Sequence, residues 1–181
     1  EAESVKAPRN NGPLAEIEFW RERSAAMCMI YEKMNMPNVM LMLKVLEIID
    51  APMMPDFKFH FSELNSLYME AKDNVKFLTT LERHFKNITS GTFAQIVETL
   101  PLMMNAIRMV WIISRHYNTD ERMVPLMESI ANEIADKVTK KIEIHTILRL
   151  PPDVALETIQ DAKAVLECWH STYMKTREKI E

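Results

Sequence analysis

The chain has 181 residues, of which 48% are hydrophobic and 27% charged, and its formal net charge is −4. This length suits one domain or a large part of one, and the apolar content is ample for a core. Its two glycines, Gly12 and Gly91, are too few for the glycine-rich loops that cradle nucleotide phosphates. Both charge signs are interspersed, so nucleic acid is not expected as a partner.

No catalytic, cofactor-binding or metal-binding residues are expected in this segment. The two cysteines, Cys28 and Cys168, match no metal-ligand spacing, which favours ordinary thiols in a reducing, intracellular compartment. The five histidines lie in separate segments, and a serine nucleophile elbow would need glycines that the chain lacks. The apolar run from Leu102 to Ile113 is too short to span a bilayer and carries Arg108, so no membrane segment is expected.

The first part of the chain predicts a lead-in followed by two helices. Residues 1–13 are polar and lack periodicity, which predicts an extended lead-in, with a helical segment over residues 14–181. Apolar residues three and four apart, including Trp20, predict a first helix that Pro37 must end or restart. A shorter helix over residues 39–49 is closed by a proline-containing break over residues 50–55.

Methionines are concentrated in this same region. Eight of the chain's 15 lie between Met27 and Met54. Flexible thioethers fill irregular cores and also furnish adaptable binding surfaces. We interpret them as core residues in preference to a partner surface.

A long helix is predicted over residues 62–88, after an aromatic connector over residues 57–61. Its stripe keeps a near-heptad step, which favours lengthwise packing on another helix; its members include Leu64, Tyr68, Ala71, Val75, Leu78 and Phe85. The periodicity leaves open whether this seam pairs within the chain or with a second chain.

The next stretch predicts two helices meeting at Pro101. Gly91 predicts a helix stop and Thr92 a cap, followed by a short helix over residues 93–99. Pro101 can open a strongly apolar helix that stops at residues 117–118. That helix carries Trp111 on its apolar side, and Thr119 predicts a hydroxyl cap for the helix that follows.

Two further elements complete the prediction. A helix runs from near Asp120 to Ile142, with acids early and bases late, in keeping with the helix dipole. Residues 144–150 form either a helical turn or a connector. A last helix begins at residues 151–153, with a stripe that includes Ala155, Ile159, Ala162, Leu166, Trp169 and Tyr173. The fold class is therefore all-α, an elongated helical-bundle segment of about six helices that continues beyond both ends.

Four stretches together resemble the N-terminal tail region of dynein heavy chains. They are GPLAEIEFWRER from Gly12, EAKDNVKFL from Glu70 with LERHF from Leu81, RMVWIISRHYNTDERM from Arg108, and Trp169 with Tyr173. The sequences of these stretches resemble axonemal heavy chains more than cytoplasmic ones. Less specifically, they resemble a two-headed inner-arm type. The segment over residues 27–54 fits the family pattern least.

The resemblance implies a role. Such a tail joins heavy chains to each other, carries intermediate and light chains, meets axonemal docking or regulatory proteins, and anchors the motor on the doublet microtubule of the cilium. ATP hydrolysis belongs to a distant part of the full chain. The candidate packing and interaction residues are Trp20, Tyr68, Val75, Phe85, Trp111, Arg115, Tyr117, Trp169 and Tyr173. The alternative is an independent helical adaptor or small-ligand bundle with a Met-lined pocket over residues 27–54.

Overall fold

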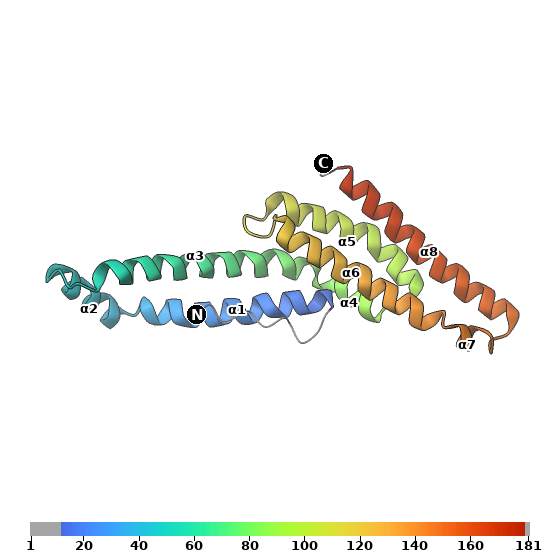
Figure 1. Ribbon diagram of the computed structural model, residues 1–181, viewed down its shortest axis with the longest axis horizontal. Helices are drawn as coiled ribbons and strands as arrows, with labels where there is room; N and C mark the ends of the chain where they lie inside the picture. Colours follow the sequence, from blue (N-terminus) through green and yellow to red (C-terminus); the bar gives the residue numbers. More distant parts are fainter. Residues whose placement is uncertain (1–11, 180–181) are drawn as a thin grey trace.

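The computed structural model describes residues 12–179, and within them the chain is built from helices (Figure 1). The elements are α1 (Pro13–Met34), α2 (Pro37–Ile48), α3 (Met54–Leu78), the 3-10 turn η1 (Thr79–Leu81), α4 (Glu82–Ser90), α5 (Phe93–Ile113), α6 (Asp120–Lys141), α7 (Ile144–Ile147) and α8 (Pro152–Arg177). Six described helices have 12 or more residues, which confirms the predicted all-α fold of about six helices. Residues 1–11 of the expected lead-in and residues 180–181 lie outside the described residues, and Pro13 opens α1.

The helices form two parts, which we name the arm and the bundle. The arm is α1, α2 and α3: α1 and α3 lie side by side in opposite directions, and α2 closes the far end (Figure 1). The bundle is α4, α5, α6 and α8 with their connections. The backbone passes from arm to bundle at η1.

The core lies in the bundle and at the root of the arm. Buried residues of α1 all precede residue 21, those of α3 follow residue 70 except Met54, and α2 has none. Each fully buried large apolar side chain contributes about 1.5–3 kcal/mol to folding. The apolar side chains with no exposed surface are Ala71, Leu78, Leu81, Phe85, Ile88, Leu100, Met103, Tyr117, Ile130 and Val165.

The long helix predicted over residues 62–88 differs at both ends. It starts earlier, at Met54, because Pro55 fits the first turn, where no amide donor is needed; the expected aromatic connector is therefore helical. It also breaks at η1, where the hydroxyls of Thr79 and Thr80 donate to backbone carbonyls three or four residues back. Such back-bonding bends helices. The predicted seam pairs within the chain, on α1.

The helix predicted to begin at Pro101 is instead the second half of a continuous α5. The Thr92 cap is confirmed as a full capping box with Gln95. Proline has no N–H, so the Val97 carbonyl four residues earlier loses its helical donor. The Cys168 thiol of α8, with Sγ 3.6 Å from that oxygen, donates to it instead. A neighbouring helix thus offsets the break that proline would otherwise cause.

Helix α5 stops at Ile113, four residues before the predicted stop. The reason is tertiary: Asp73 of α3 accepts hydrogen bonds from the Ser114 hydroxyl and the Arg115 amide. The predicted Thr119 cap is half right. Thr119 is the N-cap residue of α6, but its hydroxyl makes no capping hydrogen bond.

The last helices follow the prediction, except that α8 buries fewer residues of its apolar stripe than predicted. Residues 144–147 form the short helix α7, and α8 begins at Pro152. Helix α8 packs mainly on α5, and its buried side chains are Ala162 and Val165. Two members of the predicted stripe, Ile159 and Leu166, are 46% and 42% exposed. Contact with essentially one neighbour buries a narrower seam than the stripe predicted.

Within residues 12–179, α5 is long and apolar enough to cross a membrane by length and composition alone. The expectation that no such segment exists rested on the shortness of the apolar run over residues 102–113 and on Arg108, whereas the continuous α5 has 21 residues. Its apolar character serves the core here, since it packs against both α4 and α8.

Candidate functional site

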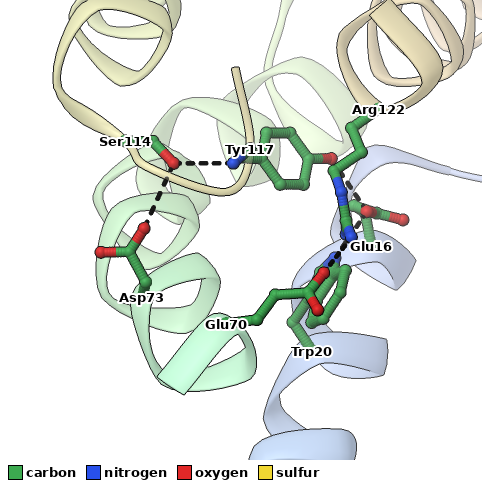
Figure 2. Close-up of polar contacts among 7 residues, drawn as sticks. All are labelled: Glu16, Trp20, Glu70, Asp73, Ser114, Tyr117 and Arg122. Atoms are coloured by element: carbon green, nitrogen blue, oxygen red, sulfur yellow. Dashed lines mark hydrogen bonds and ion pairs between the residues drawn. The ribbon is translucent and has the colours of Figure 1, made fainter. Parts of the chain in front are cut away.

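The contacts between arm and bundle, which we call the junction, contain a partly buried polar cluster (Figure 2). At its centre the Glu16 carboxylate of α1 accepts two hydrogen bonds on the same oxygen, Oε1. One comes from the Trp20 indole N–H at 2.7 Å and the other from the Tyr117 hydroxyl at 2.8 Å. Tyr117 is fully buried, and burial together with the Glu16 charge raises the pKa of its hydroxyl. The Tyr117 hydroxyl therefore keeps its proton and donates a hydrogen bond to Glu16 of the arm.

Arg122, near the start of α6, reaches the two long helices of the arm, α1 and α3. Its guanidinium pairs with the Glu70 carboxylate of α3. The same group lies over the Trp20 ring of α1, 4.6 Å from the ring centroid, in cation–π geometry. One bundle side chain thereby ties α1 and α3 to α6 at the root of the arm (Figure 2).

A second set of contacts lies at the connection between α5 and α6. The Asp73 carboxylate, on α3, accepts from the Ser114 hydroxyl at 3.4 Å and the Arg115 amide at 3.1 Å. The Ser114 oxygen in turn accepts from the Tyr117 amide at 2.9 Å. This chain of bonds fixes the turn that delivers Tyr117 to Glu16 (Figure 2).

A partly exposed ion pair also crosses the junction. Arg21 of α1 lies 2.5 Å from Glu82, the first residue of α4. Glu82 also pairs with Lys86 at 2.8 Å. These cations, Arg21 first, lower the pKa of the Glu82 carboxyl to about 2. The pair links α1 to the helix that directly follows η1.

The residues singled out from the sequence lie in different settings. Trp20, Phe85 and Tyr117 are buried. Val75, Trp111 and Trp169 are partly buried against the core. Tyr68 stacks on Tyr31 inside the arm, Arg115 contributes its backbone amide to Asp73, and Tyr173 is 36% exposed at the end of α8.

The sequence prediction missed the charged members of the cluster. Glu16, Glu70, Asp73 and Arg122 were not singled out, because helical periodicity marks apolar positions and is blind to carboxylates that meet from distant segments. A signal was present. Three of the four stretches that carry the family resemblance, those beginning at Gly12, Glu70 and Arg108, supply every residue of the cluster in Figure 2.

The far end of the arm presents a second feature, an uncovered apolar surface. Helix α2 has no buried residue, and Ile48 is 82% exposed. The interpretation of the methionines as core is wrong for most of them, since only Met54 of the eight is buried. An arm two helices thick has no third layer to cover them. The exposed large apolar residues between positions 29 and 53 are Met29, Ile30, Met36, Met40, Leu41, Met42, Val45, Ile48, Ile49 and Met53.

Small-molecule and metal chemistry find little support in this part of the chain. A shallow recess of about 300 Å³ is lined by Met29, Glu32, Lys33 and Met36. Three of these residues lie at the C-terminal end of α1 and Met36 directly precedes α2, so one short stretch of chain lines the recess, unlike the enclosed pockets that bind ligands. Over residues 12–179, no group of three or more His, Cys, Asp or Glu side chains could hold a metal ion.

Comparisons with known proteins identify the family of this chain. The family model for the dynein heavy chain, N-terminal region 1, matches residues 2–181. The Dynein-1-alpha heavy chain of the flagellar inner arm I1 complex of Chlamydomonas reinhardtii is 53% identical, covering 99% of this chain and 4% of that protein. Dynein axonemal heavy chain 10 of Homo sapiens is 46% identical, covering 100% of this chain and 4% of that protein.

A third relative is more distant. The Dynein-1-beta heavy chain of the same Chlamydomonas reinhardtii complex is 32% identical, covering 98% of this chain and 4% of that protein. The chain thus spans about 4% of the length of these relatives. The predicted resemblance is confirmed: the chain belongs to the axonemal dynein heavy chains and corresponds to part of their N-terminal region.

Proposed function

We propose that this chain is a non-catalytic structural and interaction segment of an axonemal dynein heavy chain tail. In this role it supports association with another heavy chain, docking of intermediate and light chains, and anchoring of the ciliary motor through axonemal docking or regulatory proteins. ATP hydrolysis lies in a distant motor part of the full heavy chain. The family assignment supports the proposal, and helix α2 is the observation that carries it.

The exposure of α2 has a free-energy cost. A helix that is apolar around its circumference belongs inside a protein or an interface. In α2 the exposed apolar residues occupy several sides, as the neighbouring positions Met40, Leu41 and Met42 show. Covering apolar surface contributes about 25 cal/mol per Å². A partner that covers this end therefore gains free energy that the isolated chain forgoes.

The chemistry of the surface suits more than one protein partner. Methionine side chains are unbranched and polarizable, so they adapt to differently shaped apolar surfaces. Five of the eight methionines in this region are exposed: Met29, Met36, Met40, Met42 and Met53. Specificity then comes from the few charges beside them, such as the exposed Lys58–Glu47 pair.

The proposal is tested by photo-crosslinking in the full-length heavy chain within its assembled complex. A photoreactive residue replaces Leu41 or Ile48, which are 65% and 82% exposed on α2. The matched control carries it at Gln160, on the exposed side of α8. We expect links from α2 to a heavy, intermediate or light chain, and fewer from the control. Absence of such links at both α2 positions in the intact complex would refute the role.

A second measurement separates docking from folding. Ile48→Glu adds a negative charge at an exposed position of α2. The control Lys163→Glu shifts the charge further in the same direction on the exposed side of α8 and also removes the Lys163–Glu167 ion pair. We expect Ile48→Glu to reduce the amount of partner subunits that co-purify with the heavy chain. Lys163→Glu is expected to leave that amount unchanged. Equal recovery with both variants would contradict docking through α2.

A further inference from the structure

The arm and the bundle are held together by two different kinds of contact. Apolar side chains of the arm root, Ile17 and Leu78 among them, enter the same core cluster as α5 and α6. Polar contacts surround this apolar seam, and each joins an arm residue to a bundle residue. They are Glu16 with Tyr117, Glu70 with Arg122, Asp73 with Ser114 and Arg115, and Arg21 with Glu82.

These two kinds of contact have different effects on orientation. Apolar burial is non-directional, so it favours keeping the arm root in the core without fixing an angle. Hydrogen bonds weaken steeply away from linear geometry, so they do fix an angle. The backbone link offers a pivot, because η1 interrupts the α-helical ladder between α3 and α4. The polar contacts therefore decide which orientation of the arm is favoured.

One buried polar residue on the arm side of the junction lacks hydrogen-bond partners among the described residues. Asn74 of α3 is fully buried, one helical turn from both Ala71 and Leu78, on the face that enters the core. Neither its amide oxygen nor its amide nitrogen has a hydrogen-bond partner among the described residues. A buried polar group without a partner is destabilising, and any rearrangement that lets it pair recovers that free energy.

We propose that the junction is a conformational latch that sets the angle of the arm on the bundle. Arg122, Glu16 and the other polar contacts hold the arm in the orientation of Figure 1, and Asn74 favours its release. Movement takes place about η1, and the far end of the arm, where α2 lies, sweeps the largest distance. Breaking the polar contacts gives the arm a second orientation while both parts stay folded.

The test is single-molecule fluorescence energy transfer in the full-length heavy chain within its assembled complex. Site-specific dyes replace Asn65 on the arm and Gln160 on the bundle, both exposed. The parent is expected to show one peak. The double variant Arg21→Met with Arg122→Met, which removes the two cations that cross the junction, is expected to show a broadened or second peak. Lys58→Met breaks an ion pair within the arm and should leave the parent peak unchanged.

The variant Asn74→Leu provides the decisive comparison in this experiment. Adding Asn74→Leu to the double variant is expected to return the distribution toward the parent peak, since the unpaired amide no longer favours release. A merely structural role for Asn74 would change stability and leave the peak positions unmoved. If the double variant fails to fold, Arg21→Met alone removes a partly exposed pair and is expected to broaden the peak. A parent-like peak in a folded junction variant, or a second peak insensitive to Asn74→Leu, would overturn the latch.

Discussion

Tyr117→Phe isolates one hydrogen bond of the junction without changing the shape of the core. The ring stays fully buried, and only the 2.8 Å hydrogen bond to Glu16 is lost. A hydrogen bond to a charged group contributes about 1.5–3 kcal/mol. Glu16 keeps its bond from Trp20, so we expect the lower part of this range, a loss of about 1.5–2 kcal/mol in the free energy of unfolding. Tyr117→Ala, which also empties the ring site, should cost about 3–5 kcal/mol.

The dependence on pH provides an independent check. The pKa of Tyr117 is raised in the folded state, chiefly by burial, so its stabilising contribution is complete below the unfolded pKa and is lost as pH rises above it. Above about pH 10 the unfolded tyrosine ionises while the folded one does not, which lowers the free energy of unfolding by about 1.4 kcal/mol per pH unit. Tyr117→Phe removes this contribution. The difference between parent and variant should therefore shrink between about pH 8 and about pH 11.

The assay is urea unfolding followed by circular dichroism. It uses a soluble background in which Leu41 and Ile48, both exposed on α2, are replaced by lysine. A free energy of unfolding for Tyr117→Phe within about 0.5 kcal/mol of the parent value would lie in the usual range for surface substitutions. That result would refute the stabilising role of the Tyr117–Glu16 hydrogen bond. A constant difference between parent and variant across the alkaline range would refute the pH argument.

Four further outcomes are expected. Glu82→Gln should destabilise the chain at about pH 6 and progressively less toward about pH 3. The reason is that the carboxylate stabilises the fold above its unfolded pKa and loses that contribution as pH falls toward its folded pKa of about 2. A difference from the parent that does not change with pH would contradict the ion pair. Asn74→Leu should raise the free energy of unfolding by about 1–3 kcal/mol, since it removes an unpaired buried amide; a loss of stability in urea melts would show that the amide is paired. Trp111→Ala should cost about 2 kcal/mol, between the values for exposed and fully buried sites, because the ring is partly buried; a loss below about 1 kcal/mol would place it on the surface. The unmodified chain alone should aggregate at concentrations where the variant with lysine at Leu41 and Ile48 is monodisperse in light scattering, because its apolar surface on α2 is uncovered; a monodisperse parent would argue against a docking surface there.

Helical periodicity predicted most elements of the fold and misjudged the places where distant segments decide the outcome. The α6 helix could be predicted because its apolar residues and charge order agree with each other along one segment. The end of α5 could not, since it depends on Asp73 in another helix. The break at η1 lies within an uninterrupted apolar stripe, and its threonines act through back-bonds that no periodicity reports.

The candidate site divides in the same way. Trp20 was singled out because a large aromatic residue in a helical stripe is a good packing anchor, and Tyr117 because it lies in a stretch that resembles the family. Their shared acceptor Glu16 carries no periodic signal. The exposure of α2 could not be predicted from the sequence either. Its apolar pattern fits a buried helix, and only the two-helix thickness of the arm shows that nothing in the described chain covers it.

The proline inside α5 has a consequence for how α8 is positioned. Apolar helix faces allow sliding along one another, since a shift by one turn exchanges similar side chains. The Val97 carbonyl freed by Pro101 breaks this degeneracy, because it offers one acceptor at one height along α5, and the Cys168 thiol donates to it. Displacement of α8 by a single turn would leave that oxygen without its donor. Pro101, a residue type that usually breaks helices, thereby fixes the position of α8 along the axis of α5.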